Sequence, residues 1–432
     1  MDKLRVGFIG LGNRGLNGDL PAVLRMKDIE VVAVCDLIEE RAENGGKKVR
    51  EKYGEDYDVQ VTLNYHDILA REDVDCIIVP SSWNSHYKIA CDSMRAGKPV
   101  AFEVGPVSSV EEAWELVRTH EKTGVHCMAL ENCCYGRYEL AMINMIKRGV
   151  FGEVVYLSGG YQHDLRGEIA DQYAIGTERT FHDLCRNGEL YPTHELGPMM
   201  TYVDINRGNR MLTLTSTTTK SCGLYDYVEK HGGKEHPMYG KRVNEGDVTT
   251  TVIKCANGEN IVLTHDITLP RFYSRGGRVQ GTNGIWMEDG NHIFLDGMNE
   301  HHSWENMDDY IEKYDHPLWS MFKKKGITDA HGGMDTLVLR AFFESVKNNI
   351  APPIDAYDSA CMSVVSCLSE QSIAMGSMPV PIPDFTDGKW VKREPQPKTP
   401  YALDAVHDDL FDPNNFDYFE CIREENDIKE VI

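Results

Sequence analysis

The chain has 432 residues, 41% hydrophobic and 26% charged, a composition typical of globular proteins and a length sufficient for two domains. Its 45 basic and 68 acidic side chains leave a net charge of −23, and such a surface repels nucleic acid and anionic bilayers. No apolar run is long enough to cross a membrane, and no export signal precedes the first predicted strand. We therefore expect a cytoplasmic protein without nucleic-acid or membrane partners.

The first 130 residues alternate short apolar runs with helical segments, the pattern of βαβ units around a parallel sheet. Because each run is apolar throughout, we expect both faces of this sheet to be buried. The pattern predicts strands at 4–9, 30–35, 76–79, 99–102 and 126–130, and helices at about 14–26, 39–53, 85–96, 109–122 and 135–148.

A glycine-rich turn, Gly10-Leu11-Gly12-Asn13-Arg14-Gly15, joins the first strand to the first helix, and Asp36 closes the second strand. In this order the motif is the dinucleotide-binding fingerprint. Gly10 permits the tight turn, Gly12 the approach of a pyrophosphate, and Gly15 the packing of helix on strand. N–H groups at the helix start would hold the pyrophosphate, and Asp36 would bind the ribose hydroxyls.

The residues after Asp36 are Leu37, Ile38 and Glu39, which supply no cation for a 2′-phosphate, so we predict NAD rather than NADP. Ligands of doubly wound folds bind at the carboxyl ends of the strands. Two later strands run into such loops, and we predict that they border the nicotinamide half through Trp83, His86, Glu103 and Val104. His86 taken alone is equally well explained as a histidine satisfied at a helix start.

Beyond residue 149 the pattern changes to alternating stretches rich in Thr, Val and Tyr, which predict a half-buried, largely antiparallel sheet. The predicted strands are 154–158, 212–216, 249–253 and 260–264, followed by helices at 334–348 and 356–375 and a proline-rich segment at 379–383. The fold class is therefore α/β, with a Rossmann NAD-binding domain at 1–131, an α+β domain with an open, mostly antiparallel sheet at 132–390, and an extended acidic tail at 391–432. We expect the uncovered sheet face to pair with a second copy in a homo-oligomer.

Twelve cysteines are present, and no two form a C-x-x-C pair. Neither a zinc ribbon nor a redox motif is therefore indicated. We expect free, mostly buried thiols and no metal site.

A dinucleotide-binding domain joined to an open antiparallel sheet resembles the Gfo/Idh/MocA family of sugar oxidoreductases. Further segments resemble one branch of it, glycoside hydrolase family 109, over about residues 5–390. These segments are 130–132, 135–137, 152–154, 161–166, 187–198, 204–208, 269–275, 331–335 and 382–386. The most specific is Tyr191-Pro192-Thr193-His194 with its flanks. The branch contains NAD-dependent α-N-acetylgalactosaminidases, so the resemblance implies a small glycoside as substrate.

The resemblance implies a hydrolase that holds NAD⁺ tightly and uses it without net redox change. Hydride would leave C3 of the sugar, a base would remove the acidified C2 proton, and the glycosidic oxygen would leave by elimination. Water would then add at C1 and the ketone would be reduced again. This route needs no pair of opposed carboxylates, unlike most glycosidase mechanisms.

The resemblance also implies catalytic roles. Tyr191 and His194 match substrate-contacting positions, and an imidazole with a near-neutral pKa can accept the C3 hydroxyl proton. Pro192 lies in a segment that cannot continue a helix. Tyr161 and His163 lie at period two on one strand face, and the resemblance makes Tyr161 an acid/base residue and places His163 beside nicotinamide or sugar. Without it, Tyr161 would be interpreted as an ordinary sheet residue.

Further contacts are implied elsewhere in the chain. Substrate contacts are expected from Glu131, Arg179, Tyr191, Pro192, Thr193, His194 and Tyr273. Asn132 matches a cofactor position. His331 begins a predicted helix, where a pocket role and a capping role are equally well supported.

One segment departs from the larger family. Family dehydrogenases carry Glu-Lys-Pro where this chain has Glu103-Val104-Gly105-Pro106, so the lysine that helps to deprotonate the reacting hydroxyl is missing. This loss argues against an ordinary sugar dehydrogenase and agrees with the glycosidase branch. Two alternatives stay open: an oxidoreductase that forms a 3-keto sugar and releases NADH, and a non-catalytic NAD-binding sensor. Many members of the branch carry an export signal that this chain lacks, which favours small imported glycosides.

Overall fold

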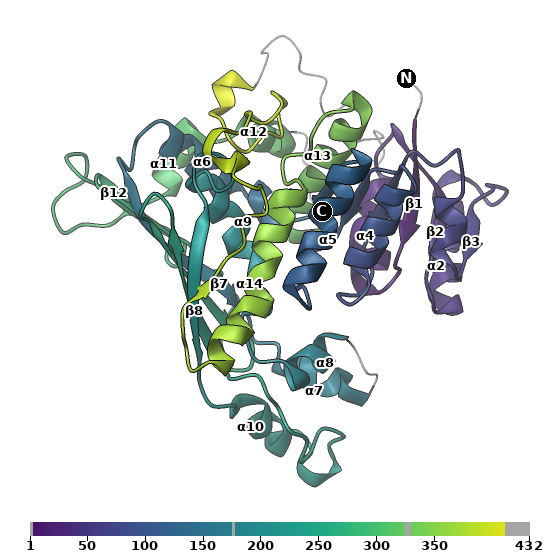
Figure 1. Cartoon of the computed structure of the whole chain (residues 1–432), viewed down its shortest axis with the longest axis horizontal. Coiled ribbons are helices and arrows are strands. Elements are labelled where there is room, and N and C mark those ends of the chain that lie inside the picture. Colours follow the sequence, from purple (N-terminus) through teal and green to yellow (C-terminus); the bar gives the residue numbers. More distant parts are fainter. Residues whose placement is uncertain (1–2, 175–177, 325–329, 411–432) are drawn as a thin grey trace.

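The protein has two β-sheets with a layer of helices between them (Figure 1). The computed structural model describes residues 3–174, 178–324 and 330–410. The first sheet has six strands in the order β3-β2-β1-β4-β5-β6, and the second has nine in the order β14-β13-β12-β11-β7-β10-β9-β8-β15. These two sheets are the predicted Rossmann sheet and the predicted open sheet.

Every strand pair of the first sheet is parallel. Its strands are β1 (Leu4–Ile9), β2 (Ile29–Cys35), β3 (Gln60–Thr62), β4 (Cys76–Val79), β5 (Val100–Phe102) and β6 (Cys127–Ala129). The helical elements are η1 (Gly15–Asp19), α1 (Leu20–Leu24), α2 (Glu39–Tyr53), α3 (Tyr65–Leu69), α4 (His86–Arg95) and α5 (Val110–Thr123). Strands β4, β5 and β6 are buried at every residue, which confirms that both faces of the sheet are covered.

The helix predicted at about 14–26 is confirmed, but Gly15–Asp19 forms a π-helical turn within it, ahead of α1. Gly15 and Gly18 weaken the α-helical preference of this turn, and π turns are common at functional sites. Strand β3 and helix α3 were not predicted, because they are short and β3 is only half-buried.

The second sheet is antiparallel except for the parallel pair β7 and β10. Its strands are β7 (Val154–Gln162), β8 (Met211–Thr218), β9 (Val248–Cys255), β10 (Asn260–Asp266), β11 (Arg278–Gly281), β12 (Gly284–Met287), β13 (His292–Leu295), β14 (Glu305–Asn306) and β15 (Val380–Pro381). The helical elements of this half are η2 (Asn132–Tyr135), α6 (Arg137–Lys147), α7 (Arg166–Asp171), η3 (Gln172–Ala174), α8 (Glu178–Cys185), α9 (Thr193–Tyr202), α10 (Gly223–Lys230), η4 (Gly233–Glu235), α11 (Asp308–Tyr314), α12 (Pro317–Lys324), η5 (Ala330–Gly333), α13 (Met334–Asn348), α14 (Ala356–Ala374), η6 (Lys389–Lys392) and η7 (His407–Asp409).

The second sheet has one buried and one exposed face. In β9 the side chains of Thr251 and Ile253 are buried, whereas those of Val252 and Lys254, which alternate with them, are exposed. Helices α9 and α14 pack on the buried side (Figure 1). The alternation confirms the half-buried sheet expected from the sequence, and pairing of the exposed face with a second copy stays a prediction.

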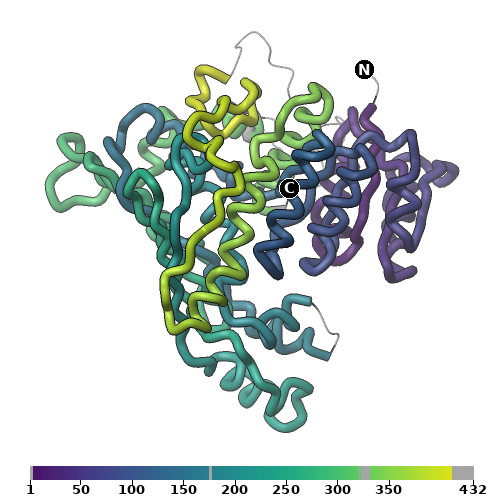
Figure 2. The backbone as a smooth tube through the Cα atoms, in the orientation of Figure 1, coloured from purple at the N-terminus to yellow at the C-terminus, as the bar shows by residue number. Residues whose placement is uncertain are grey.

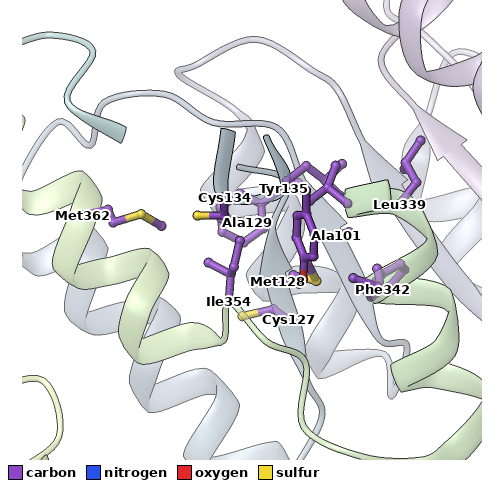
Figure 3. Close-up of a cluster of buried hydrophobic side chains, with 14 of the residues drawn as sticks. Ala101, Cys127, Met128, Ala129, Cys134, Tyr135, Leu339, Phe342, Ile354 and Met362 are labelled. Atoms are coloured by element: carbon purple, nitrogen blue, oxygen red, sulfur yellow. The ribbon is translucent and has the colours of Figure 1, made fainter. Parts of the chain in front are cut away.

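The core is continuous across the two halves of the chain. Figure 3 shows Met128 of the first sheet close to Tyr135, to Phe342 of α13 and to Ile354, with Met362 of α14 beyond them. Burial of such apolar side chains contributes about 1.5–3 kcal/mol each, so separating the halves would be unfavourable.

The chain returns from β15 to the body of the protein before residue 410 (Figure 2). Tyr401 and Leu403 belong to the common core, and the backbone carbonyl of Tyr401 accepts a hydrogen bond of 2.9 Å from the hydroxyl of Tyr135. The first half of the predicted tail is therefore packed against the body, and residues 411–432 lie outside the described part.

The described cysteines are free and most are buried, as predicted; Cys421 lies outside the described residues. Within residues 3–174, 178–324 and 330–410, no helix has the length and apolarity of a membrane span.

Candidate active site

The glycine turn between β1 and η1 has the shape that a dinucleotide needs. A Cβ at Gly10, where φ is +110°, would lie 2.6 Å from the Cα of Ser81, and one at Gly15 would lie 2.2 Å from the carbonyl oxygen of Gly10. A Cβ at Gly12 would meet no atom within 4 Å. Gly10 and Gly15 are thus required by close packing, while Gly12 leaves open space beside the helix start. The turn fits a pyrophosphate in the predicted manner.

Asp36 lies at the end of β2, beside this turn. Its Oδ2 accepts a hydrogen bond of 2.7 Å from the Leu11 N–H, and its Oδ1 accepts one of 2.9 Å from the Ile38 N–H. Asp36 therefore holds the glycine turn in place in addition to its predicted role at the ribose. Leu37 beside it is 85% exposed and brings no charge.

Arg14, in the same turn, is held by acidic side chains from three elements. Its Nε donates to Glu103 at 2.9 Å, and its two terminal nitrogens bind the carboxylate of Asp335 at 2.8 and 2.9 Å. A further ion pair of 3.1 Å joins it to Asp19. The guanidinium is therefore paired with acidic side chains. Any contact of Arg14 with the cofactor would come from its backbone.

Asp335 is the residue that the sequence analysis missed. It accepts a hydrogen bond of 2.6 Å from the Asn132 amide and contacts Nδ1 of His331 at 2.9 Å. Burial alone would raise the pKa of Asp335, but the bonds from His331 and Arg14 outweigh it and hold the pKa well below its usual range. Two of the predicted cofactor residues, Arg14 and Asn132, thus converge on one ionised carboxylate. His331 lies in η5, ahead of α13, and is not the cap of that helix.

Trp83 and His86 pack against the loop at 103–106. A Cβ at Gly105 would lie 2.6 Å from Trp83 Cδ1 and 2.8 Å from His86 Cε1, so a side chain at position 105 would displace them. His86 is fully buried, and neither ring nitrogen meets a hydrogen-bond partner among the described residues. Burial and His182 lower the pKa of His86 to about 3, so the ring is neutral. The structure thus places His86 behind the site surface, and Val104 is buried as well.

The four predicted catalytic residues lie together at the end of β7 and the start of α9. The ring of Tyr161 is 4.7 Å from that of Tyr191 and 5.6 Å from that of His194. The Tyr161 hydroxyl lies 3.1 Å from Nδ1 of His163. Tyr273, which is 48% exposed, packs its ring 5.1 Å from His163. The structure thus brings these five aromatic and imidazole side chains together in one cluster, and their catalytic roles stay a prediction.

Helix α9 begins directly after Pro192, at Thr193, although the proline was expected to keep this segment non-helical. A proline is tolerated at a helix start because the first N–H groups have no intrahelical partner. His194 is therefore held in the first turn of a helix. Pro192 and Thr193 are buried, so Tyr191 and His194 present the accessible surface of this motif to a substrate.

Glu131 orients His194. Its two carboxylate oxygens lie 2.8 and 3.1 Å from His194 Nδ1, and one of them also accepts the Cys133 N–H at 3.0 Å. The side chain is 0% exposed, so the predicted contact of Glu131 with sugar is not supported. Burial alone would raise the pKa of Glu131, but His194 outweighs it and the pKa is lowered. A carboxylate on Nδ1 leaves Nε2 of His194 free to accept a proton.

Arg179 of α8 joins the two sides of the site. Its guanidinium lies over the rings of Trp83 and Tyr191, at 5.2 Å from each, and 5.9 Å from the ring of Tyr161. Burial raises the pKa of Tyr161, and the positive charge of Arg179 opposes that shift. Arg179 is therefore placed to contact substrate and to favour the ionised form of Tyr161.

Glu131, Cys133 and His194 bring one ligand atom each within 4.8 Å of one another, and within the described ranges they are the one such group. We attribute this proximity to the hydrogen bonds of Glu131 with His194 and with the Cys133 backbone. We assign no metal to it.

Two family models match the chain. Residues 4–130 match the oxidoreductase family with an NAD-binding Rossmann fold, and residues 135–392 match the C-terminal domain of glycosyl hydrolase 109. An α-N-acetylgalactosaminidase of Tannerella forsythia is 41% identical over 413 residues, covering 91% of this chain and 88% of the relative. A glycosyl hydrolase family 109 protein of Parabacteroides distasonis is 38% identical over 423 residues, covering 91% and 89%.

Solved structures share the fold at low sequence identity. An NAD binding oxidoreductase from Klebsiella pneumoniae has a TM-score of 0.70 and 18% identity, covering 88% of this chain and 99% of that one. A myo-inositol dehydrogenase from Lactobacillus casei, in complex with NAD(H) and myo-inositol, has a TM-score of 0.59 and 15% identity, covering 90% and 100%.

Proposed function

Because the chain belongs to glycoside hydrolase family 109, we propose that it cleaves α-N-acetylgalactosaminides with NAD⁺ as its cofactor, through oxidation at C3, elimination, hydration and re-reduction. The observation that carries this proposal is the pair of buried Glu131 and half-buried His194, 2.8 Å apart, beside Tyr161 and Arg179. Such a pair supplies acid and base catalysis without the two opposed carboxylates of an ordinary glycosidase.

The cofactor assignment rests on the glycine turn and Asp36. Bound NAD⁺ would supply a reversible hydride acceptor. The open space at Gly12 admits a pyrophosphate, and Asp36 lies where it can bind ribose hydroxyls. A 2′-phosphate would meet the carboxylate of Asp36 with only Leu37 and Ile38 beside it, so we favour NAD over NADP.

His194 is the proposed base for the sugar hydroxyl that is oxidised. Glu131 accepts a hydrogen bond from Nδ1–H, and Nε2 then takes the proton of the C3 hydroxyl. When the ketone is reduced again, the same nitrogen returns the proton to the oxygen. Glu131 stays ionised throughout and stabilises the imidazolium.

Tyr161 is the proposed base for C2. Burial raises the pKa of Tyr161 and Arg179 opposes that shift, so the ionised form is reached with the help of the guanidinium. Ionised Tyr161 takes the C2 proton, the C1–C2 double bond forms, and the C1–oxygen bond breaks. The leaving oxygen takes a proton from solvent as the aglycone departs. Water then adds its oxygen at C1 and gives one proton back to solvent, and the Tyr161 hydroxyl returns a proton to C2. Nδ1 of His163 lies 3.1 Å from the Tyr161 hydroxyl and hydrogen-bonds to it while Tyr161 takes up and returns the proton.

The test is turnover of p-nitrophenyl N-acetyl-α-galactosaminide in deuterated buffer, with a small panel of other glycosides. The mechanism predicts aglycone release, no accumulation of absorbance at 340 nm, and deuterium at C2 of the product. Release without label would refute the elimination step. Stoichiometric NADH without cleavage would indicate a dehydrogenase, and NAD binding without turnover of any sugar would indicate a sensor.

A further inference from the structure

Four ionisable side chains form a second buried cluster directly behind the aromatic side of the site. Asp183 comes from α8, Glu189 from the segment before α9, Glu245 from the loop before β9, and His265 from β10. Their exposed fractions are 1%, 0%, 1% and 3% in that order. These side chains are shielded from solvent, so their protonation states depend on the protein groups around them.

The imidazole of His265 lies between two carboxyl groups. Its Nε2 is 3.0 Å from Glu245 Oε1, and its Nδ1 is 3.5 Å from Glu189 Oε1. The Asp183 carboxyl is within hydrogen-bond reach of the Glu245 carboxyl. Ionised, these two acids accept hydrogen bonds only, and neither has a donor among the described residues. One of the two carboxyls can keep a proton and donate a hydrogen bond to the other, as in other buried carboxyl pairs.

The cations around the cluster do not offset three negative charges. Arg186 is paired bidentately with Glu370, and Asp266, which adjoins His265, is paired with Arg271 at 2.8 Å. Arg179 acts on Asp183, Glu245 and His265, and Arg186 also acts on Glu245 despite its pairing with Glu370.

Protons therefore remain on the acids at neutral pH. Burial raises the pKa of Glu189 to about 7 and that of Glu245 to about 8, and it raises the pKa of Asp183 well above its usual range. Burial lowers the pKa of His265, so its ring stays neutral. The cluster carries little charge near pH 6 and gains negative charge as the pH rises through these values.

The cluster contacts the catalytic group from two directions. His265 and Tyr161 are register partners on the parallel strands β10 and β7, and their rings stack at 6.4 Å with 26° between their planes. Arg179 lies between the two sets, over the Tyr161 ring on one side and acting on Asp183 on the other. Negative charge on the cluster would weaken the stabilisation that the positive charge of Arg179 gives to the ionised form of Tyr161.

We propose that Asp183, Glu189, Glu245 and His265 form a proton-sharing network that sets how strongly Arg179 acidifies Tyr161. While the network holds its protons, the charge of Arg179 is shared only between Tyr161, Tyr191 and its ion-pair partner Glu168, 3.6 Å away. When the network ionises, Arg179 is shared and Tyr161 holds its proton more tightly. These residues position charge and contact no substrate. The effect of these residues on turnover rests on the proposed function, whereas their effect on the ionisation of Tyr161 does not.

The test replaces Glu245 by a side chain that keeps the shape and stays neutral. With Glu245→Gln we expect wild-type kcat near pH 6 and, above pH 8, a kcat up to about tenfold higher, the change in tyrosinate that one pKa unit gives. Asp183→Asn should act in the same direction. Glu121→Gln neutralises a carboxyl of α5 that contacts Tyr357 and Lys389, and it should leave the profile unchanged. Profiles of Glu245→Gln and wild type that coincide at every pH would overturn the proposal.

A second readout is independent of turnover. In protein labelled with ¹³Cζ-tyrosine, the Tyr161 resonance, assigned through Tyr161→Phe, should titrate at lower pH in Glu245→Gln than in wild type. If no glycoside is cleaved but this shift is seen, the network stands and the proposed function fails. An unchanged Tyr161 titration in a folded variant refutes the network. Retention by the wild type of one equivalent of a divalent cation, lost in Asp183→Asn, also refutes it, since a cation would then neutralise the acids.

Discussion

Glu131→Gln tests the Glu131–His194 pair, which carries the proposed chemistry. The N–O distance of 2.8 Å is that of a charge-assisted hydrogen bond. Such a bond contributes about 1.5–3 kcal/mol, which corresponds to about a 10- to 100-fold loss of kcat at roughly 1.4 kcal/mol per factor of ten. An amide in this place can also donate to Nδ1 and hold the wrong tautomer, for which the loss in a serine protease triad reaches about 10⁴. We therefore expect kcat to fall by about 10²–10⁴.

The assay compares kcat, KM and NAD affinity of wild type and Glu131→Gln. NAD affinity, measured by isothermal titration calorimetry, should be unchanged, because Glu131 bonds to His194 and to the backbone of Cys133. The matched control is again Glu121→Gln, which removes a carboxylate that contacts Tyr357 and Lys389. A kcat within threefold of wild type, in a variant with a wild-type melting temperature, would refute the role of Glu131.

Three further predictions concern the cofactor turn and the acid/base residue. Gly12→Ala should fold normally and lose NAD affinity, whereas Gly15→Ala, whose Cβ would lie 2.2 Å from a backbone oxygen, should lose about 1–3 kcal/mol of stability; equal urea midpoints would contradict this. Asp335→Asn should reduce the free energy of unfolding at pH 7 by about 3–5 kcal/mol. Because the folded pKa of Asp335 is depressed, its contribution is complete above its unfolded pKa and is lost as the pH falls toward the folded value, so the difference should shrink at pH 3. Tyr161→Phe should abolish turnover and retain NAD binding; wild-type turnover would remove Tyr161 from the mechanism.

The sequence predicted those parts of the fold and site that have local causes. Continuous apolar runs predicted the parallel sheet, alternation predicted the open sheet, and the spacing of glycines predicted the cofactor turn. The clustering of Tyr161 with His194 came from resemblance, since a tyrosine on a strand has no local sign of catalysis.

The parts that were missed depend on contacts between distant segments. Asp335 meets Arg14 across most of the chain, and no local pattern marks that contact. The role of Glu131 changed because its burial and its bond to His194 appear only in three dimensions. The network behind Tyr161 draws its members from four separate elements, so spacing along the chain could not assemble it.

The continuous core between the halves affects how the cofactor and the sugars could enter and leave the enzyme. A dehydrogenase must release NADH after every turn, and in a two-domain protein hinge opening provides that exit. Here, opening the hinge would expose the apolar side chains around Met128 and Phe342 to water. A catalyst that restores NAD⁺ in place has no such need. On the proposed mechanism the dinucleotide need not leave between turnovers, and Tyr273, 48% exposed, marks an accessible edge of the site for sugars.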